Sequence, residues 1–291
     1  MTNRRYSRPS CCSYSTNRQG RLIRSLCRTT VPAPPETGTK ALIDPGQVCA
    51  SIRSRGAVHV PGQDLQAALG LDSPETRNFL LSWEDMAVDR YIQREDMTRR
   101  RRFGRFTLDR ADSRLERLPH RPFFQSKQIN QLSGGIQRVF EPMRDDVATS
   151  PVLGRIVRFV IDCLPIDPKA PMDVNAHQIR VIAGDQSASP TPEGLHQDGH
   201  DFVAQVLIRR HNITGAESTV LNETRDETLV RQTLETSFDL VVVDDHRTWH
   251  GVSAFERAGP GPAFRDMLII DFNRIAASNS HAAPEADAVP A

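Results

Sequence analysis

Residues 176–183, with the sequence AHQIRVIA, begin the part of the chain that decides the fold. Further short segments of β type follow at 203–209, 217–221, 238–243, 248–255 and 265–272. Turn signals separate them, among them Asp198-Gly199 and the GPGP run at 259–262. Short strands without long helices between them predict an antiparallel double-stranded β-helix, a jelly-roll or cupin-like core, over residues 171–275.

Residues 41–170 predict a helical layer supporting this core, so the expected fold class is mainly β with helical support. Ser73-Pro74 is a good N-cap and first-turn pair, and the helix it opens is expected to run toward Ile92. Ser150-Pro151 opens a second helix, whose apolar residues form one stripe. A short strand is expected at 101–110. Together, residues 41–275 are expected to form one domain.

The first 40 residues contain seven arginines and many Ser and Thr residues, and no acidic residue precedes Glu36. This composition predicts a disordered segment. An organelle transit peptide, or a start codon assigned too early, would explain the same composition. Residues 276–291 are small and polar, and we expect them to be a frayed tail.

The overall composition excludes some classes of protein. The 291 residues include 37 basic and 36 acidic side chains, so the formal charge is +1 and gives no global attraction to nucleic acid. Apolar stretches are far shorter than the roughly 20 residues that cross a bilayer. Five cysteines without a CxxC pair argue against a disulfide framework or a zinc ribbon. A reducing, cytoplasmic location is expected, and nothing indicates the oligomeric state.

The stretch His196-Gln-Asp-Gly-His200 is the densest cluster of potential metal ligands. In a helix, the two histidines would share one face, but Gly199 lies inside that turn and a strand follows, so we reject the helix. In an extended chain, His196 and Asp198 point to the same side. An imidazole and a carboxylate are two members of the facial triad of two histidines and one carboxylate. By itself this motif is weak, because such residues also cap turns.

His250 is the candidate for the third ligand, because it lies in a strand pattern of the same β core. If its strand forms a hairpin with the strand ending at Phe272, His250 stands opposite Ile269 and shares its face with Arg265. A register slip would reverse this face, and the two strands can also belong to opposite sheets of a jelly roll. An inward arginine requires an anion, whereas the alternative is a surface arginine at a strand end.

Arg180 is a second candidate for anion binding. It lies on the strand that enters the core, next to Ile179 and Val181, and alternation can turn its side chain toward the pocket.

The chain resembles the iron(II)- and 2-oxoglutarate-dependent dioxygenases, and specifically the small bacterial family typified by L-isoleucine 4-hydroxylase. The likeness covers roughly residues 75–275 and includes residues unrelated to metal binding. It is carried by the stretches 119–127 (PHRPFFQSK), 177–180 (HQIR), 194–203 (GLHQDGHDFV), 207–213 (LIRRHNI), 244–246 (DDH) and 250–252 (HGV).

The resemblance implies that His196, Asp198 and His250 bind Fe(2+) and that Arg265 binds the distal carboxylate of the cosubstrate 2-oxoglutarate, with O2 as the other cosubstrate. Arg180 would contact 2-oxoglutarate or a substrate carboxylate. The expected function is hydroxylation of a small molecule, a free aliphatic L-amino acid.

Two other functions stay open at this point. A catalytically inactive metal-binding jelly roll could serve as a regulatory or sensor protein, but such a site would not need Arg265 as an anion clamp. A nucleic-acid demethylating oxygenase is disfavoured by the near-neutral charge.

Overall fold

The computed structural model describes residues 14–16, 22–24, 43–94, 97–109, 114–125, 134–167, 170–184 and 187–275. They fall into two compact units, Met1–Ala41 and Leu42–Ala291. In the first unit, strands β1 (Tyr14–Thr16) and β2 (Leu22–Arg24) pair antiparallel. The rest of the N-terminal segment and residues 276–291, for which we predicted disorder and fraying, lie outside the described residues.

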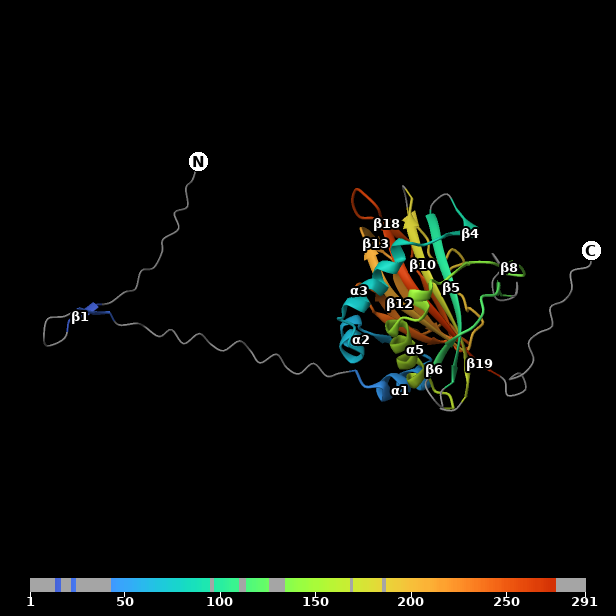
Figure 1. Cartoon of the computed structure of the whole chain (residues 1–291), viewed down its shortest axis with the longest axis horizontal. Coiled ribbons are helices and arrows are strands. Elements are labelled where there is room, and N and C mark those ends of the chain that lie inside the picture. The colour runs from blue at the N-terminus through green and yellow to red at the C-terminus, as the bar shows by residue number, and fades with distance from the viewer. Residues whose placement is uncertain are drawn as a thin grey trace, which may run out of the picture. The chain divides into compact units, whose positions relative to one another are not determined.

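A nine-stranded sheet forms the centre of the second unit (Figure 1). Its strand order is β3-β16-β12-β19-β10-β5-β4, with β6 and β9 also pairing with β5. The strands are β3 (Ala57–Val60), β4 (Val88–Gln93), β5 (Met97–Asp109), β6 (Arg114–Arg117), β9 (Glu141–Pro142), β10 (Met172–Ala183), β12 (Phe202–His211), β16 (Leu240–Asp244) and β19 (Phe264–Arg274).

Smaller sheets pack against one face of this sheet. Their orders are β15-β14-β17, β11-β18-β13 and β7-β8. A buried apolar cluster joins Val203 and Leu207 of the large sheet to Val220 and Val230. Two facing sheets around such a core confirm the predicted jelly roll. The strands are β7 (Phe123–Phe124), β8 (Gln137–Arg138), β11 (Ser187–Ala188), β13 (Ile213–Gly215), β14 (Glu217–Asn222), β15 (Thr228–Thr233), β17 (Thr248–Val252) and β18 (Phe255–Arg257).

Helices cover the other face of the large sheet (Figure 1). Three of them start at a side-chain N-cap followed by proline, with Asp44, Ser73 and Ser150 accepting a backbone N–H of the first turn. The helices are α1 (Pro45–Arg55), α2 (Gly62–Leu69), α3 (Pro74–Leu81), the short 3₁₀ helix η1 (Ser82–Glu84), α4 (Asp145–Ala148) and α5 (Pro151–Cys163).

Alternation along β19 separates this helical core from the interior of the jelly roll. Leu268, Ile270 and Phe272 are fully buried in the core that includes the helices. Met267 and Ile269, at the alternate positions, belong to the cluster on the opposite face. Successive side chains of a strand point to opposite faces, so Arg265 and Asp271 also point away from the helices.

Several boundaries differ from the prediction. The helix that begins at Pro74 ends at Leu81, and Ile92 lies in strand β4. The strand expected at 101–110 begins earlier, at Met97, and becomes the 13-residue β5. Residues 41–170 therefore supply strands β3–β9 as well as helices. The sequence of β5 hid its length, because four consecutive arginines at 99–102 leave no apolar alternation in its first half.

The hairpin that we considered between the strands of His250 and Arg265 does not form, and the alternative, in which the two strands belong to opposite sheets, is the one that the structure shows. Strand β17 pairs with β14, which places Val220 opposite His250. Strand β19 pairs with β10 and β12 in the other sheet, where Ile269 stands opposite His177 and Gln205. The Gly- and Pro-rich loop at 259–262 follows β18, a separate short strand, so the chain changes sheets before β19 begins.

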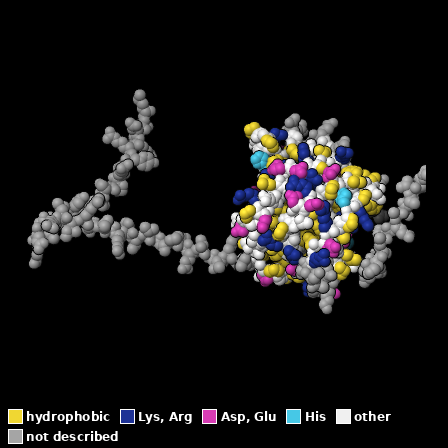
Figure 2. Space-filling model, viewed as in Figure 1, with side chains coloured by type: hydrophobic (Ala, Val, Ile, Leu, Met, Phe, Trp, Pro, Cys, Tyr) yellow, Lys and Arg dark blue, Asp and Glu magenta, His cyan; other side chains and the backbone are white. Residues whose placement is uncertain are grey.

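On the face shown in Figure 2, basic and acidic side chains are mixed and no large area carries one sign of charge. Within the described residues, no helix is long and apolar enough to cross a membrane.

Candidate active site

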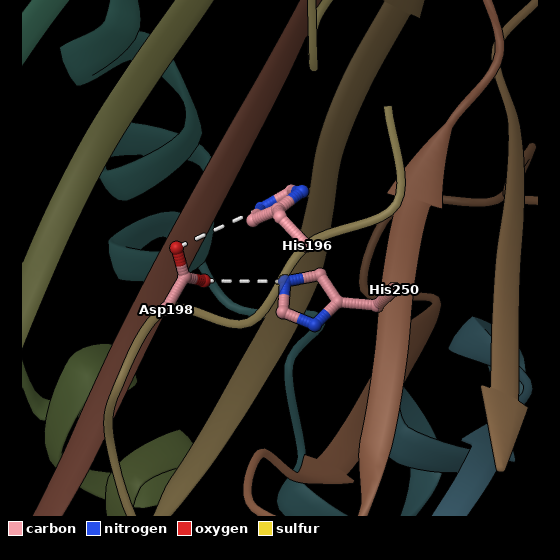
Figure 3. Close-up of side chains that lie close together, drawn as sticks. All are labelled: His196, Asp198 and His250. Carbon is pink, nitrogen blue, oxygen red and sulfur yellow. Dashed lines mark hydrogen bonds and ion pairs between the residues drawn. The ribbon is translucent and has the colours of Figure 1, made fainter. Parts of the chain in front are cut away.

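Two chain segments bring three potential metal ligands together (Figure 3). His196 and Asp198 lie in the segment between β11 and β12, and His250 lies in β17. The backbones of His196 and His250 form an antiparallel bridge, with N–H to carbonyl distances of 2.9 and 3.0 Å. This bridge fixes the two imidazoles beside each other, with ring centroids 4.5 Å apart.

The ligand atoms of His196, Asp198 and His250 all lie within 4.8 Å of one another. Nε2 of His250 is 3.2 Å from Oδ2 of Asp198, and Nε2 of His196 is 3.7 Å from Oδ1. Burial favours a higher pKa for Asp198, but the hydrogen bond and charge of His250 outweigh it and hold the pKa below its ordinary value. The carboxylate form is the one that binds a metal.

A hydrogen bond on the far side of the His196 ring and a carboxylate on the far side of the His250 ring orient the cluster. Nδ1 of His196 lies 3.0 Å from the carbonyl of Gly194, which requires the proton on Nδ1 and leaves the lone pair on Nε2. Nδ1 of His250 is 3.5 Å from Oδ1 of Asp245. Both Nε2 atoms therefore face Asp198, as metal-binding imidazoles with a supporting partner do.

Asp245 is a fully buried residue that supports the whole turn. Its carboxylate accepts the backbone N–H groups of Asp198, Gly199 and His200 at 3.1, 2.6 and 3.1 Å. Gly199 has φ +81°, a left-handed conformation that glycine adopts without strain. Together they turn the chain sharply between Asp198 and β12. Sequence reasoning missed Asp245, because nothing in the local sequence at 244–246 distinguishes its carboxylate from that of Asp244.

The cluster opens into a cavity of about 1060 Å³, counting the part that is open to solvent. Its walls come from both sheets of the jelly roll and from the segment that carries β7 and β8. The side chains that line the cavity include Arg99, Arg101, Phe123, Gln125, Arg138, His177, Ile179, Val181, His196, Asp198, His250, Arg265 and Asp271.

Arg265 points into this cavity from β19 and is 3% exposed. Among the described residues its hydrogen bond is weak, from Nη2 to Oγ of Ser218 at 3.4 Å, and Nε has no hydrogen-bond partner there. Burial, with the charge of Arg210, lowers its pKa to about 10. A buried guanidinium without a carboxylate partner is costly, so the site is prepared for an anion.

The structure corrects the expectation that Arg180 faces the pocket. Ile179 and Val181 line the cavity, so alternation directs Arg180 to the other face of β10. There its Nε and Nη2 donate to the two carboxylate oxygens of Asp266 at 2.6 and 2.8 Å. Glu84 lies 3.2 Å from Nη1. Arg180 is therefore part of an ion-pair network outside the cavity.

Three buried polar side chains, which we did not predict as a group, form a hydrogen-bonded series on the cavity wall that β5 and β10 build. Arg101 lies 2.7 Å from Nδ1 of His177, and Nε2 of His177 lies 2.9 Å from Asp271. Burial lowers the pKa of His177 to about 4, so the imidazole is neutral, accepts from Arg101 and donates to Asp271. His200 lies 3.3 Å from Asp271 and is not in the three-residue cluster.

Two imidazoles and one carboxylate on a buried cavity wall are the ligand set of non-haem iron(II) oxygenases. A comparison with protein families agrees with this ligand set, because residues 81–271 match the family model described as 2OG-Fe dioxygenase. The chain belongs to the 2OG-Fe dioxygenase family. Members of this family use Fe(2+), 2-oxoglutarate and O2.

Two curated relatives are similar to this 2OG-Fe dioxygenase over 160 residues. The L-isoleucine-4-hydroxylase of Bacillus thuringiensis is 28% identical, covering 52% of this chain and 65% of the relative. The 3(1)-hydroxy-L-isoleucine 4-dioxygenase of Pantoea ananatis is 27% identical, covering 53% and 64%. The chain thus matches slightly less than two thirds of the length of each relative.

Solved structures share the fold. A bsmA homologue from Methylobium petroleophilum superposes with a TM-score of 0.72 at 26% identity, covering 81% of this chain and 95% of that one. IDO from Bacillus thuringiensis superposes with a TM-score of 0.63 at 20% identity, covering 80% and 96%. At that level of identity the second likeness concerns the fold alone.

Proposed function

We propose that this 2OG-Fe dioxygenase hydroxylates a free aliphatic L-amino acid, using Fe(2+), 2-oxoglutarate and O2. His196, Asp198 and His250 hold the iron, and Arg265 binds the distal carboxylate of 2-oxoglutarate. One observation carries the proposal: the three ligands line the same cavity as the buried Arg265, which has no carboxylate partner among the described residues.

The residues of the chain have separate tasks in this reaction. Bound iron, together with 2-oxoglutarate and O2, supplies the oxidation that replaces C–H by C–OH while 2-oxoglutarate is converted to succinate and CO2. The imidazoles and Asp198 fix the metal, and Asp245 holds Asp198 and His250 in place. Arg265 offers two parallel N–H donors to a carboxylate, which orients the cosubstrate.

The substrate class is supported by the names of the curated relatives, both of which concern isoleucine or its hydroxylated form. The cavity has both polar and apolar walls, because Arg265 lines it together with Ile179 and Val181, and such a mixture suits a small molecule that has a charged and an aliphatic part.

The rival function is a metal-binding jelly roll that acts as a sensor. Arg265 argues against it, because a site that binds only a metal has no use for a buried guanidinium on another wall of the cavity.

The test is release of succinate by the purified protein with Fe(II), 2-oxoglutarate and a panel of free L-amino acids, with the hydroxylated product identified by mass spectrometry. We expect stimulated succinate release with at least one aliphatic member. His196→Ala, Asp198→Ala and His250→Ala should each abolish turnover. His246→Ala, an exposed histidine of the neighbouring turn, is the matched control and should keep full activity. Succinate release that persists in all three variants would disprove the site.

A further inference from the structure

Strand β12 places a buried amide in the wall of the cavity. Gln205 is 7% exposed and lines the cavity. Its side-chain amide makes no hydrogen bond with any of the described residues. Ile269 of β19 and Val241 of β16 stand directly opposite it on the two neighbouring strands. Both of these side chains are aliphatic, so neither can bond to the amide.

The orientation of this amide follows from the alternation of side chains along β12. Ala204 and Val206 are fully buried in the core that includes the helices. Val203 and Leu207 belong to the apolar cluster between the two facing sheets. Gln205 lies between Val203 and Leu207 on their face of the strand, so its side chain points into the interior of the jelly roll. It is a polar position in an otherwise apolar row.

Such an amide is unfavourable for the protein without a ligand. Removing an amide from water without replacing its hydrogen bonds destabilises the folded state. A methionine at position 205 would fill a similar volume and leave no polar group unpaired. The chain therefore gives up stability at Gln205, and a ligand that enters the cavity can supply the missing hydrogen bond.

Gln205 lies between the two ends of the proposed cosubstrate site. Along the cavity face of β19, Arg265 is followed by Ile269 and then by Asp271. Nε2 of His200, in the turn that carries the metal-binding carboxylate, lies 3.3 Å from Oδ2 of Asp271. The row of Ile269 and Gln205 is roughly 13 Å along the strand from Arg265 and roughly 7 Å from Asp271. A ligand that extends from Arg265 to the metal therefore crosses the row of Gln205.

We propose that the amide of Gln205 donates a hydrogen bond to 2-oxoglutarate and so positions the cosubstrate between Arg265 and the metal. This inference rests on the proposed function, because that function places the two ends of 2-oxoglutarate at Arg265 and at the metal. The dianion of 2-oxoglutarate offers only acceptor oxygens, so the NH2 group is the part of the amide that it would use. Hydrogen bonds to a charged oxygen are stronger than those between neutral groups.

The first arm of the test measures affinity in Gln205→Met. 2-Oxoglutarate is titrated into the anaerobic Fe(II) complex without amino acid, and the metal-to-ligand absorption band is followed. We expect the dissociation constant to rise about 10- to 100-fold, the effect of losing a hydrogen bond to a charged group. Affinity for Fe(II) alone should stay within about threefold. An unchanged dissociation constant for 2-oxoglutarate would overturn the inference and leave the amide to water or to the primary substrate.

The second arm measures the thermal stability of the protein without metal or ligand. Gln205→Met removes an unpaired polar group from the interior, so the melting temperature should rise by about 2–4 °C. A glutamine that only supports the fold would give the opposite sign. Gln205→Leu repeats both measurements with a side chain of different shape. A lower melting temperature in both variants would overturn the inference, because the amide would then stabilise the protein in the absence of a ligand.

Gln178→Met is the matched control. Gln178 is a fully buried glutamine of β10, and its Nε2 donates to Oγ of Ser82 at 2.9 Å. Its neighbours His177 and Ile179 line the cavity, so alternation directs Gln178 toward the helices. The affinity of Gln178→Met for 2-oxoglutarate should stay within about threefold of wild type. A loss equal to that of Gln205→Met would contradict a direct contact, because it would follow from any change of a buried glutamine.

The failure of this inference differs from failure of the proposed function. If the wild-type protein binds 2-oxoglutarate with Fe(II), and Gln205→Met binds it equally well, the proposed function stands and only the role of Gln205 is lost. If the wild-type protein shows no absorption band with Fe(II) and 2-oxoglutarate, both are lost.

Discussion

The carboxylate of Asp245 lies 3.5 Å from Nδ1 of His250 and also accepts the backbone N–H of Asp198 at 3.1 Å. One buried side chain thus connects the two segments that supply the candidate iron ligands. Because the segments are about fifty positions apart in the sequence, their alignment depends on this bridge as well as on the backbone bridge between His196 and His250.

We expect Asp245→Asn to weaken Fe(II) binding about 10- to 100-fold, the usual effect of losing a supporting partner of a metal ligand. The amide replaces one acceptor oxygen with an NH2 group, which cannot accept the N–H of Gly199 or His200. The measurement is anaerobic Fe(II) titration against a competing chelator, with circular dichroism to verify folding. Asp244→Asn is the control, because Asp244 is adjacent but its carboxylate lies near Arg247. Equal losses in the two variants would contradict a special role for Asp245.

For Arg265, we expect Arg265→Ala to weaken 2-oxoglutarate binding by roughly 30- to 1000-fold, which corresponds to about 2–4 kcal/mol for a buried charged hydrogen-bond pair. Arg265→Lys should recover part of this loss, because an ammonium cannot reproduce the two parallel donors. Affinity for Fe(II) alone should change little. The dissociation constant is measured by titrating 2-oxoglutarate into the anaerobic iron complex. An unchanged constant in Arg265→Ala would return the metal sensor to consideration.

Arg180, unlike Arg265, is paired with a carboxylate of the chain, so its replacement should affect stability and not the binding of 2-oxoglutarate. Asp266 is fully buried and receives two hydrogen bonds from Arg180, while Arg209 lies 3.3 Å away as a second cation. Arg180→Gln should therefore lower the free energy of unfolding by about 3 kcal/mol, the cost of leaving a buried charge poorly paired. Affinity for 2-oxoglutarate should stay within about threefold of wild type. Urea unfolding and the same anaerobic titration measure the two quantities. Weakened 2-oxoglutarate binding without loss of stability would reverse our assignment.

The sequence was sufficient to predict the jelly roll and the candidate ligands, because both depend on short-range patterns. The i and i+2 spacing of His196 and Asp198 places them on one side of an extended segment whatever its partner strand. His250 and Arg265 do face one cavity, although the hairpin that we used to place them does not exist. Both side chains nevertheless face the cavity, because each of the two sheets of a jelly roll directs one face inward.

The remaining part of the site depends on contacts that no local pattern encodes. Five arginines crowd residues 99–105, and only the pairing of β5 with β10 determines that Arg99 and Arg101 face the cavity. For Arg180, strand alternation alone does not say which of two neighbouring positions faces the cavity, and the structure turns Ile179 and Val181 inward and Arg180 outward. Asp245 lies in a stretch with turn composition, and its burial becomes evident only when residues 198–200 fold onto it.

The last prediction concerns pH and His177. Burial, followed by the charge of Arg101, lowers the pKa of His177 from 6.5 to about 4 in the folded protein, whereas the unfolded chain keeps the ordinary value. Between these values the unfolded state binds more protons, so stability is complete above pH 6.5 and decreases as the pH falls toward 4. This residue alone should cost about 2 kcal/mol of unfolding free energy between pH 7 and pH 5. His177→Gln can still accept from Arg101 and donate to Asp271 but cannot be protonated, so its loss over this range should be smaller by that amount. Urea unfolding of both proteins at the two pH values makes the comparison. Equal losses in the two proteins would mean that His177 is not held neutral by its position between Arg101 and Asp271.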